Sequence, residues 1–373
     1  MRNWPQRFRA YALVAGQNTD ELARQIHEFR PTVAVVATEE VRANLTSELN
    51  AIGMARSEWP ELLFGSVARK EVATANQVDF VLSAIVGVAG LEATYEAVCQ
   101  GKTIGLANKE VLVASGELVM NAARQHSTSI LPVDSEHNGA HQCLRAGLRA
   151  EAVKLILTAS GGPFRRTPAS QFGSITPAQA LKHPTWKMGP RVTVDSATLM
   201  NKGFEVIEAC WLFDFKPREV EVVIHPQSTV HAMVEYVDGS VMAQVCATDM
   251  RMPIQYAMTY PERADAPVPR LDWREARQWE FYPPDLERFP LLRIAYQAQE
   301  AGGSATCSMN AADEIAVEAF LGEQLPFTGI SEVVSETLER VPSRTLRSVE
   351  DVMQVDAVSR ETARKCVRQR ALV

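Results

Sequence analysis

The sequence has no run of apolar residues long enough to cross a membrane. A membrane-spanning helix needs about 20 consecutive apolar residues, and polar or charged residues interrupt every apolar run of this chain before that length is reached. The first residues, Met1 to Pro5, carry no apolar stretch of the kind that a secretory signal requires. We therefore expect a cytoplasmic protein with no membrane partner.

Paired cysteines and an excess of basic residues are also missing. The six cysteines are scattered and form no Cys-x-x-Cys pair, which argues against a disulfide framework and a thiolate zinc site. Lys and Arg number 38 against 45 Asp and Glu, for a formal net charge of −7. Without a basic surface nothing offsets repulsion by phosphates, so we expect no nucleic-acid partner.

The chain of 373 residues is too long for one ordinary core, so it predicts two or three domains. As far as Leu157, short apolar runs that read as strands alternate with helical patterns, and this order is typical of a parallel α/β sheet. The expected strands are 12–15, 33–36, 81–85, 103–106 and 130–133, and the expected helices between them are 20–29, 91–100 and 116–125. Ligands of such sheets bind at the carboxyl ends of the strands, where Gly16, Gly87, Asn108 and Asp134 fall.

The rest of the chain has a different pattern. An α+β region is expected first, with strands at 153–160, 220–225, 229–236 and 240–246, a helix at 197–213, and a hairpin turn at Asp238-Gly239. The proline-rich stretch 260–290 indicates a linker. Beyond Leu291 the apolar spacing is helical, with candidate helices at 309–321, 330–340 and 348–370.

Two acids follow the expected strand that ends near Val133. Asp134 and Glu136 would point to the same side of an extended chain, close enough to share one hard cation. An acidic helix cap explains the same residues equally well. A third acid elsewhere in the chain would favour the cation site.

That third acid lies in the segment from Asp195 to Glu208. If the segment is helical, Asn201 and Lys202 share one face with Glu205, because residues three and four apart are neighbours on a helix. Gly203 costs about 1 kcal/mol in a helix interior relative to alanine, so we expect another part of the chain to approach it. Taken alone, the segment is read more simply as an N-cap at Ser196 followed by a solvated ion pair of Lys202 and Glu205.

Several loops carry weaker signals. Ser160-Gly161-Gly162 has the parts of an anion-binding nest but is equally a tight turn. The loop from His183 to Gly189 contains Trp186 and Met188 where a solvated loop would be polar, so it predicts either a lid or a packed loop. Histidines such as His225 and His231 are more often structural than catalytic, and Lys109 can face either solvent or a bound anion.

Taken together, these segments resemble one family, 1-deoxy-D-xylulose 5-phosphate reductoisomerase of the non-mevalonate isoprenoid pathway. The resemblance covers essentially the whole chain. It is carried by the segments 107–110, 132–138, 158–164, 183–189, 194–208, 224–231 and 310–319, of which 133–138 and 195–208 are the most specific.

The resemblance implies an enzyme that uses NADPH and Mg²⁺, Mn²⁺ or Co²⁺. Its substrate would be a phosphorylated keto-sugar, which is rearranged and reduced to 2-C-methyl-D-erythritol 4-phosphate, and its assembly a homodimer. It implies a Rossmann-like parallel sheet domain, an α+β catalytic domain and a C-terminal helical domain. The expected boundaries are 1–133 for NADPH binding, 134–259 for catalysis, metal binding and dimerisation, 260–290 for the linker and 291–373 for the helical domain.

The resemblance also assigns roles to residues. The expected metal ligands are Asp134, Glu136 and Glu205. The expected substrate contacts are Lys109, Ser135, Glu136, Ser160, His183, Ser196, Asn201, Lys202 and Glu205. The expected catalytic residues are Glu136, Lys109, His183, Trp186 and His231, and the expected cofactor contacts are Gly16, Gln17, Asn18, Asn108, Glu110, Met188 and Gly189. Three carboxylates and no softer ligand suit a hard cation with open positions for substrate oxygens.

The start of the chain departs from the family pattern. The family opens with a strand and a G-x-T-G-x-x-G turn that holds the pyrophosphate at a helix N-terminus, whereas Arg2 to Gly16 already resembles the segment that enters the second strand. We therefore expect the NADPH domain to be incomplete at its N-terminus. The rival hypothesis is a truncated, non-catalytic homologue that keeps metal and sugar-phosphate binding. A different dehydrogenase of similar architecture is a third reading, disfavoured by the specific motifs.

Overall fold

The computed structural model describes residues 1–370 and divides into two compact units. Unit 1 comprises Met1–Asn108 and Asn121–Leu131, and unit 2 comprises Lys109–Met120 and the chain from Pro132 onward. Within residues 1–370, none of the helices combines the length and apolar character that a membrane span requires. The predicted boundaries at 133, 259 and 290 stay predictions, because this division follows contacts rather than function.

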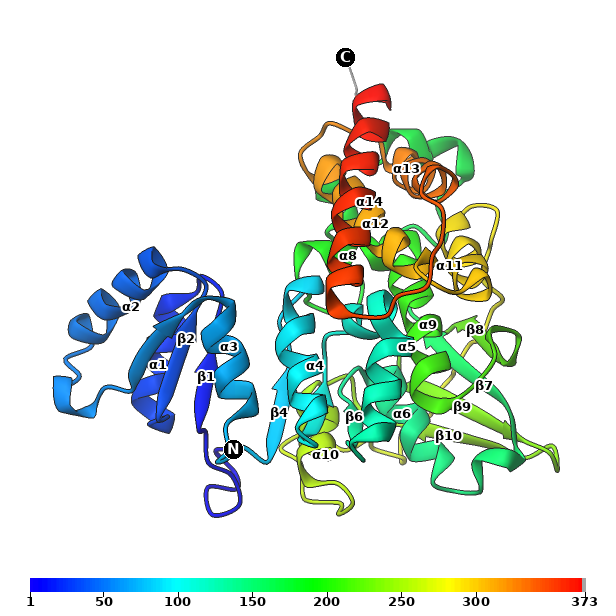
Figure 1. Cartoon of the computed structure of the whole chain (residues 1–373). Helices are drawn as coiled ribbons and strands as arrows, with labels where there is room; N and C mark the ends of the chain where they lie inside the picture. The colour runs from blue at the N-terminus through cyan, green and yellow to red at the C-terminus, as the bar shows by residue number, and fades with distance from the viewer. Residues whose placement is uncertain (371–373) are drawn as a thin grey trace. The chain divides into compact units, whose positions relative to one another are not determined.

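Unit 1 contains six short strands in two parallel three-stranded sheets (Figure 1). The first sheet has the order β1-β2-β3 and the second the order β4-β5-β6. Their bounds are β1 Ala12–Val14, β2 Val33–Val36, β3 Glu61–Phe64, β4 Phe80–Ser83, β5 Thr103–Leu106 and β6 Ile130–Pro132. The parallel α/β prediction is confirmed for these strands, although the sequence analysis missed β3, whose pattern is only half-buried.

Five helices follow these strands. They are α1 Thr19–Phe29, α2 Glu39–Ala51, α3 Gly65–Thr74, α4 Leu91–Cys99 and α5 Glu110–Gln125. Helices α2 and α3 were not predicted from the sequence. The predicted start of α5 was Gly116, whereas the helix begins at Glu110 and is kinked at Ser115, whose backbone is not helical. The Ser115 hydroxyl donates to the Val111 carbonyl, which explains how the kink is held.

Unit 2 is built on a four-stranded mixed sheet of order β10-β9-β7-β8. The strands are β7 Ala152–Ala159, β8 Val220–Ile224, β9 Val230–Tyr236 and β10 Val241–Val245, close to the predicted ranges. β7 pairs with β8 in parallel and with β9 antiparallel, and the predicted hairpin joins β9 to β10 at Gly239, whose φ is 82°. Leu155, Leu157 and Val234 are fully buried where the sheet meets the helices.

Helices α6 Ser135–Leu144 and α9 Met200–Phe213 pack on this sheet, and α7 Pro177–Ala180, α8 Pro190–Thr198 and α10 Arg251–Thr259 lie against other helices of unit 2. The prediction of one helix from Ala197 to Phe213 was wrong, because Leu199 adopts a left-handed conformation with φ 63° and separates α8 from α9. The predicted close approach to Gly203 is confirmed. A side chain there would place its Cβ 2.6 Å from that of Ala295 in the neighbouring helix.

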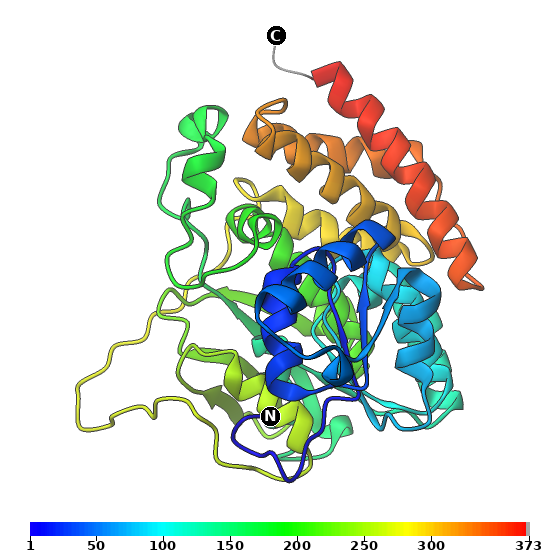
Figure 2. The same ribbon diagram turned by 90° about the vertical axis from the view of Figure 1, so that its left-hand side faces the viewer.

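The C-terminal part of unit 2 is helical, as predicted. It contains α11 Pro290–Ala301, α12 Ala305–Leu321, α13 Phe327–Arg340 and α14 Val349–Arg370, and α14 runs beside α12 (Figure 1). The predicted linker before it is an extended loop in Figure 2, attached to the sheet by a bridge between Ile224 and Tyr282. Short 3₁₀ turns lie at Arg56–Glu58, Val88–Gly90, Arg149–Glu151, Ala169–Ser174 and Pro217–Glu219.

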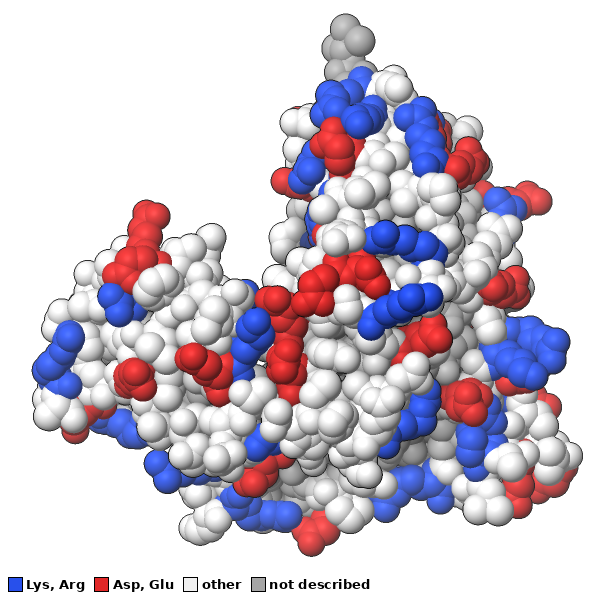
Figure 3. All heavy atoms as spheres, viewed as in Figure 1, with Lys and Arg blue, Asp and Glu red and all other residues white. Residues whose placement is uncertain are grey.

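The charged side chains are mixed in sign over the surface that is visible in Figure 3. Basic and acidic groups alternate over that face with apolar and neutral residues between them. Many of them form exposed ion pairs such as Arg24 with Asp20 and Arg42 with Glu39. Such pairs contribute little to stability.

Candidate active site

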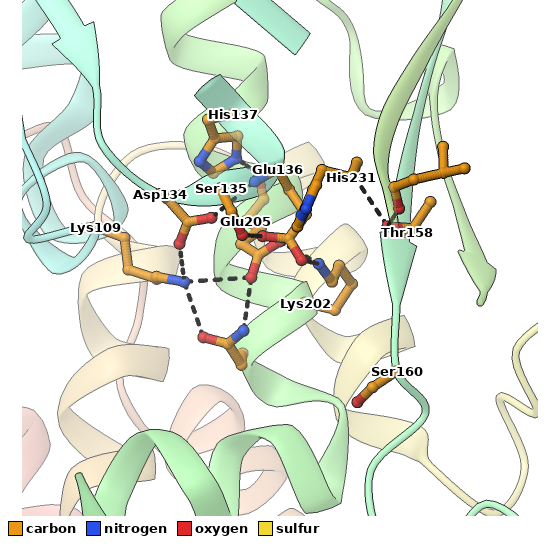
Figure 4. Close-up of polar contacts among 12 residues, drawn as sticks. Lys109, Asp134, Ser135, Glu136, His137, Thr158, Ser160, Lys202, Glu205 and His231 are labelled. Atoms are coloured by element: carbon orange, nitrogen blue, oxygen red, sulfur yellow. Dashed lines mark hydrogen bonds and ion pairs between the residues drawn. The ribbon is translucent and has the colours of Figure 1, made fainter. Parts of the chain in front are cut away.

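Three helix starts in unit 2 bring the candidate site together. Lys109 immediately precedes α5, Asp134 is the N-cap of α6 with Glu136 in its first turn, and Asn201, Lys202 and Glu205 occupy the first two turns of α9. Figure 4 shows the lysine and carboxylate side chains of this group pointing toward one another. Polar residues are favoured at helix starts because the first backbone N–H groups lack partners within the helix.

Lysine and carboxylate groups alternate within the cluster. The Lys109 ammonium lies 2.5 Å from Asp134 Oδ2 and 3.3 Å from Glu205 Oε1, and it donates to Asn201 Oδ1 at 2.8 Å. Lys202 Nζ lies 3.2 Å from Glu136 Oε1 and forms an ion pair with Glu205 Oε2. Asn201 Nδ2 donates to Glu205 Oε1 at 2.6 Å. Glu205 is therefore the centre of the cluster, since both lysines and the amide contact it.

The structure corrects the argument that was made for the first acid pair. Asp134 and Glu136 do not share an extended chain, because Glu136 already lies in α6 and its backbone N–H donates to Asp134 Oδ1 at 3.3 Å. Asp134 is thus a helix cap as well as a member of the cluster. The simpler reading of the second segment is wrong, because Ser196 lies inside α8 and Lys202 and Glu205 are buried rather than solvated.

Burial and charge act in opposite directions on these groups. Burial alone would lower the pKa of Lys109, but the carboxylates of Asp134 and Glu205 outweigh it and hold the pKa well above its ordinary value. The pKa of Lys202 is also raised, by Glu136 and Glu205 against the effect of burial. Burial raises the pKa of Asp134, and Lys109 more than reverses this, so that its pKa lies below the usual range. Both lysines are therefore ammonium ions at neutral pH.

The donor set suits a hard divalent cation. One oxygen each of Asp134, Glu136 and Glu205 lies within 4.8 Å of the others. Burial and the neighbouring acids raise the pKa of Glu205 in spite of the lysines, so more positive charge would stabilise its ionised form. Oxygen donors with no sulfur or imidazole are those that Mg²⁺ and Mn²⁺ prefer. The predicted ligands are thus brought together in a geometry that a metal ion can use.

A second acidic group adjoins the first and is less suited to an ion. His137 Nδ1 lies 2.8 Å from Glu208 Oε2, and its Nε2 lies 2.8 Å from the Glu205 carbonyl oxygen. Asp134, His137 and Glu208 could also surround a cation, but His137 and Glu208 are fully buried against each other. Because Nδ1 lies beside the Glu208 carboxylate and Nε2 beside the Glu205 carbonyl, both ring nitrogens already face oxygens of the protein, and we favour the first group as the cation site. We interpret this pair as a buried contact that holds α6 against α9.

The remaining predicted residues of unit 2 form two smaller contacts. Ser160 Oγ lies 3.0 Å from His183 Nε2, and His183 Nδ1 accepts from the backbone N–H of Thr185 and Trp186. This arrangement fixes the turn of the loop that carries Trp186. In Figure 4, Ser160 lies at the end of its strand, apart from the carboxylates.

His231 lies under the loop. Its ring centroid is 6.5 Å from that of Trp186, and its Nε2 is buried without a hydrogen-bond partner among residues 1–370. Burial and then the charge of Lys202 lower the pKa of His231 to about 4, so it is neutral at physiological pH. By contrast His225 is satisfied, since it stacks on Phe281 at 4.7 Å and its Nε2 accepts from two backbone N–H groups.

Ser135, Ser196, Met188 and Gly189 complete the predicted set in unit 2. Ser135 donates to Glu136 Oε2 at 2.6 Å, which orients that carboxylate. Ser196 is half-buried in α8, and its carbonyl would lie 2.7 Å from a Cβ at Gly162. Gly189 is the N-cap of α8, and its carbonyl and that of Met188 accept from Thr193 Oγ1. Only glycine allows the loop after Ser160 to approach α8 so closely.

The predicted cofactor residues of unit 1 lie where strands end. Gly16, Gln17 and Asn18 follow β1, and Asn18 caps α1 by accepting from the Glu21 backbone N–H. Gly16 has open space around the position of a Cβ. Asn108 follows β5, and its side chain donates to the Ile85 and Gly87 carbonyls. The last predicted cofactor residue, Glu110, belongs to unit 2, where its carboxylate lies 3.0 Å from the Arg191 guanidinium.

Sequence reasoning missed several residues that hold the site. His137 lies within the segment 132–138 but was given no role, and none was given to Glu208, Arg191 or Asp313. The signal for Glu208 was present, because an acid among the apolar residues of a buried helix needs a partner. The partners themselves are distant in sequence, and a single sequence does not reveal them.

Comparison with protein families gives three matches along the chain. Residues 1–116 match the model described as 1-deoxy-D-xylulose 5-phosphate reductoisomerase. Residues 130–213 match the 1-deoxy-D-xylulose 5-phosphate reductoisomerase C-terminal domain, and residues 245–362 match the DXP reductoisomerase C-terminal domain.

Individual proteins give the same result. The 1-deoxy-D-xylulose 5-phosphate reductoisomerase of Solibacter usitatus is 67% identical over 364 residues, which are 98% of this chain and 92% of the relative. That of Chlorobaculum tepidum is 47% identical over 98% of this chain and 94% of its own. The solved structure from Zymomonas mobilis with NADPH is 40% identical, covers 98% of this chain and 93% of that one, and has a TM-score of 0.90. A structure of DOX-P reductoisomerase with NADPH, fosmidomycin and magnesium is 38% identical over 98% of this chain and 93% of that one, with a TM-score of 0.92.

The His137–Glu208 pair predicts an unusual titration. Burial would lower the pKa of His137, but Glu208 raises it to about 9, whereas burial and then Arg145 lower the pKa of His141 to about 4. Protonated His137 stabilises the folded metal-free protein fully below about pH 6.5, and this stabilisation is lost as the pH rises through about 9. Imidazole NMR of the metal-free protein should show two histidines that titrate far apart. A Glu208→Gln variant should lower the pKa of His137 and leave His141 unchanged; an unchanged His137 would contradict the pairing.

Proposed function

The chain belongs to the 1-deoxy-D-xylulose 5-phosphate reductoisomerase family, and on this basis we propose which of its residues perform the reaction. The enzyme converts 1-deoxy-D-xylulose 5-phosphate to 2-C-methyl-D-erythritol 4-phosphate in isoprenoid biosynthesis, and it uses NADPH and magnesium. The observation on which the assignment of residues depends is the convergence of three carboxylates and two ammonium groups in one cluster.

Asp134, Glu136 and Glu205 would hold the cation, Mg²⁺ or in its place Mn²⁺ or Co²⁺. The support is that their oxygens lie within 4.8 Å of one another and that Ser135 and Asn201 orient two of the three carboxylates. The bound cation supplies Lewis-acid stabilisation of the ketone and hydroxyl oxygens of the sugar. Glu136 and Glu205 also lie where they would contact the substrate once the cation is bound.

Lys109 and Lys202 would bind substrate oxygens. Each is an ammonium ion with several carboxylate neighbours, so each can give up one contact to an incoming anion and remain partly neutralised. Lys202 with Ser160, Ser196 and Asn201 would hold the phosphate, because a cation with hydroxyl and amide donors matches its oxygens. Lys109, with Ser135, would contact the sugar chain. Binding at the phosphate end would position the reacting carbons.

His183, Trp186 and His231 would close the site. The loop is anchored by the contact of His183 with Ser160 and covers His231 with the indole of Trp186. A closed indole would exclude water from the reacting carbonyl. His231 is neutral and its free Nε2 can accept a hydrogen bond from a substrate hydroxyl or donate one to a carbonyl.

NADPH supplies the hydride that reduces the rearranged aldehyde. In unit 1 the dinucleotide would contact Gly16, Gln17, Asn18 and Asn108, because the N-terminus of α1 offers backbone N–H groups and Gly16 leaves space for an approaching group. In unit 2, Met188 and Gly189 would lie on the nicotinamide side. The Glu110 carboxylate is engaged with Arg191, so its own contribution to cofactor binding would be indirect.

The rival hypothesis, a non-catalytic homologue, depended on an incomplete first domain. The family match begins at residue 1 and β1 begins at Ala12. These findings do not confirm that a first strand is absent, and that expectation stays a prediction. NADPH oxidation measured at 340 nm separates the two readings, because only the active enzyme consumes NADPH when substrate and Mn²⁺ are added. The expected cytoplasmic location likewise stays a prediction.

We propose a homodimer formed through the sheet of unit 2. Helices α6 and α9 pack on one face of this sheet. The strand register places Ile156, Met233 and Val241 on the other face, beside an ion-paired cluster of Lys154, Glu221 and Glu235, and Val241 is 48% exposed on the edge strand. Apolar residues on an open sheet face are typical of an interface between subunits.

Removal of one ligand carboxylate tests the metal assignment. Glu205→Gln or Asp134→Asn should abolish turnover, a loss of roughly 1,000-fold or more in kcat, while circular dichroism and the melting temperature stay near those of the parent. Glu318→Gln on the exposed face of α12 is the matched control and should keep full activity. Near-normal rates of the Glu205 variant at saturating Mn²⁺ would refute the ligand assignment.

Charge on the open sheet face tests the dimer. Val241→Lys should convert a dimer to a monomer in light scattering coupled to gel filtration, because each subunit would bury an unpaired ammonium group in the interface. Val358→Lys, on the exposed side of α14 and 57% exposed, should leave the mass unchanged. A Val241 variant that remains dimeric would place the interface elsewhere.

A further inference from the structure

Arg191 occupies a central position in unit 2 that the proposed function does not use. It lies in the first turn of α8, directly after the loop that carries Trp186. Its side chain is only 16% exposed, and burial of an arginine is costly unless its charge and its N–H groups find partners. The acids around it raise its pKa against the effect of burial, so the guanidinium is always charged.

The guanidinium contacts three helices. Nη1 lies 3.0 Å from Glu110 Oε1 at the start of α5 and 2.5 Å from Glu314 Oε1 in α12. Nη2 donates to Asn310 Oδ1 at 2.9 Å and lies 3.4 Å from Asp313 Oδ2, both in α12. Nε lies 3.7 Å from Asp195 Oδ2, one turn along α8.

Three residues close to the Arg191 guanidinium are sequence neighbours of proposed site residues. Glu110 is next to Lys109 in sequence, and Asp195 is next to Ser196. The guanidinium also lies 5.7 Å from the ring centroid of Phe204, the neighbour of Glu205. Arg191 thus lies beside three segments of the chain. These segments carry a proposed sugar contact, a proposed phosphate contact and a proposed metal ligand.

The acids around Arg191 outnumber the bases. Glu110 of α5, Asp195 of α8, and Asp313 and Glu314 of α12 face Arg191, while Arg360 of α14 pairs with Glu314 and with Asp356 of its own helix. Asp195 and Asp313 are both buried, and the Oδ1 atom of each has no hydrogen-bond partner among residues 1–370. The guanidinium of Arg191 is therefore the positive charge on which these two carboxylates depend.

We propose that Arg191 is a positioning residue of the reductoisomerase reaction, which holds α8 against α5 and α12 so that Ser196 and Lys109 face the same bound sugar phosphate. The inference rests on the proposed function, since it concerns the placement of those substrate contacts. Lysine could not replace it, because a single ammonium lacks the planar fork of N–H groups that reaches Glu110, Glu314 and Asn310 at once.

The test compares Arg191→Lys with the parent and with Arg368→Lys, an arginine that is 63% exposed on α14. In Arg191→Lys we expect kcat/KM for 1-deoxy-D-xylulose 5-phosphate to fall roughly 30- to 100-fold, mainly through a higher KM for the sugar, with KM for NADPH unchanged within about twofold. Arg368→Lys should match the parent. A merely structural role would reduce the active fraction, so kcat would fall while both KM values stayed the same, and that result would overturn the proposal.

The outcomes also separate this proposal from the proposed function. If the parent chain with Mn²⁺, substrate and NADPH shows no turnover, the proposed function fails. If the parent turns over and Arg191→Lys has parental KM and kcat, only the role of Arg191 fails. Should Arg191→Lys fold poorly, Glu110→Gln removes one contact while keeping the guanidinium, and it should raise KM for the sugar selectively; an unchanged KM would also overturn the proposal.

Discussion

Three carboxylates held within 4.8 Å of one another can exist together only if positive charge is close to them. At about 4 Å, two like charges repel by about 4 kcal/mol with an effective dielectric constant of about 20, and this site has three such pairs. Lys109 and Lys202 supply part of the compensation by contacting all three acids between them. Two ammonium ions against three carboxylates leave a negative excess, and a divalent cation reverses it. This excess of negative charge is what would draw in the cation that the reaction uses.

Such a cluster needs rigid supports, because each acid would move apart from the others if its helix were free to move. Asp134 and Glu136 are fixed by the capped start of α6, and Glu205 is fixed by its place in α9. The His137–Glu208 pair joins the two helices, since the imidazole reaches both the Glu208 carboxylate and the Glu205 carbonyl. Arg191 then joins the neighbouring helix starts. The geometry of the proposed metal site is thus a property of helix packing and not of one flexible loop.

The sequence was informative wherever the relevant geometry was local. The face shared by Asn201, Lys202 and Glu205 was predictable, because it follows from the helical repeat alone. The pairing of Asp134 with Glu136 was predicted for an incorrect reason, since a helix cap rather than an extended chain brings the two acids together. The break at Leu199 was missed because leucine rarely adopts a left-handed conformation, so its presence does not predict one. Contacts such as Arg191 with Glu110 and Asp313 join residues about 80 and 120 positions apart, and local pattern contains no record of them.

The structure balances an excess of buried acid in two places and in two different ways. At the proposed metal site the carboxylate side chains of Asp134 and Glu136 keep 12% and 16% of their surface exposed, which would let a cation enter. At Arg191 the carboxylates of Asp195 and Asp313 are 4% and 0% exposed, and the positive charge beside them is an arginine of the chain itself. Access therefore distinguishes the two clusters. The more open one can take up a cation from solvent, whereas the closed one keeps a fixed support.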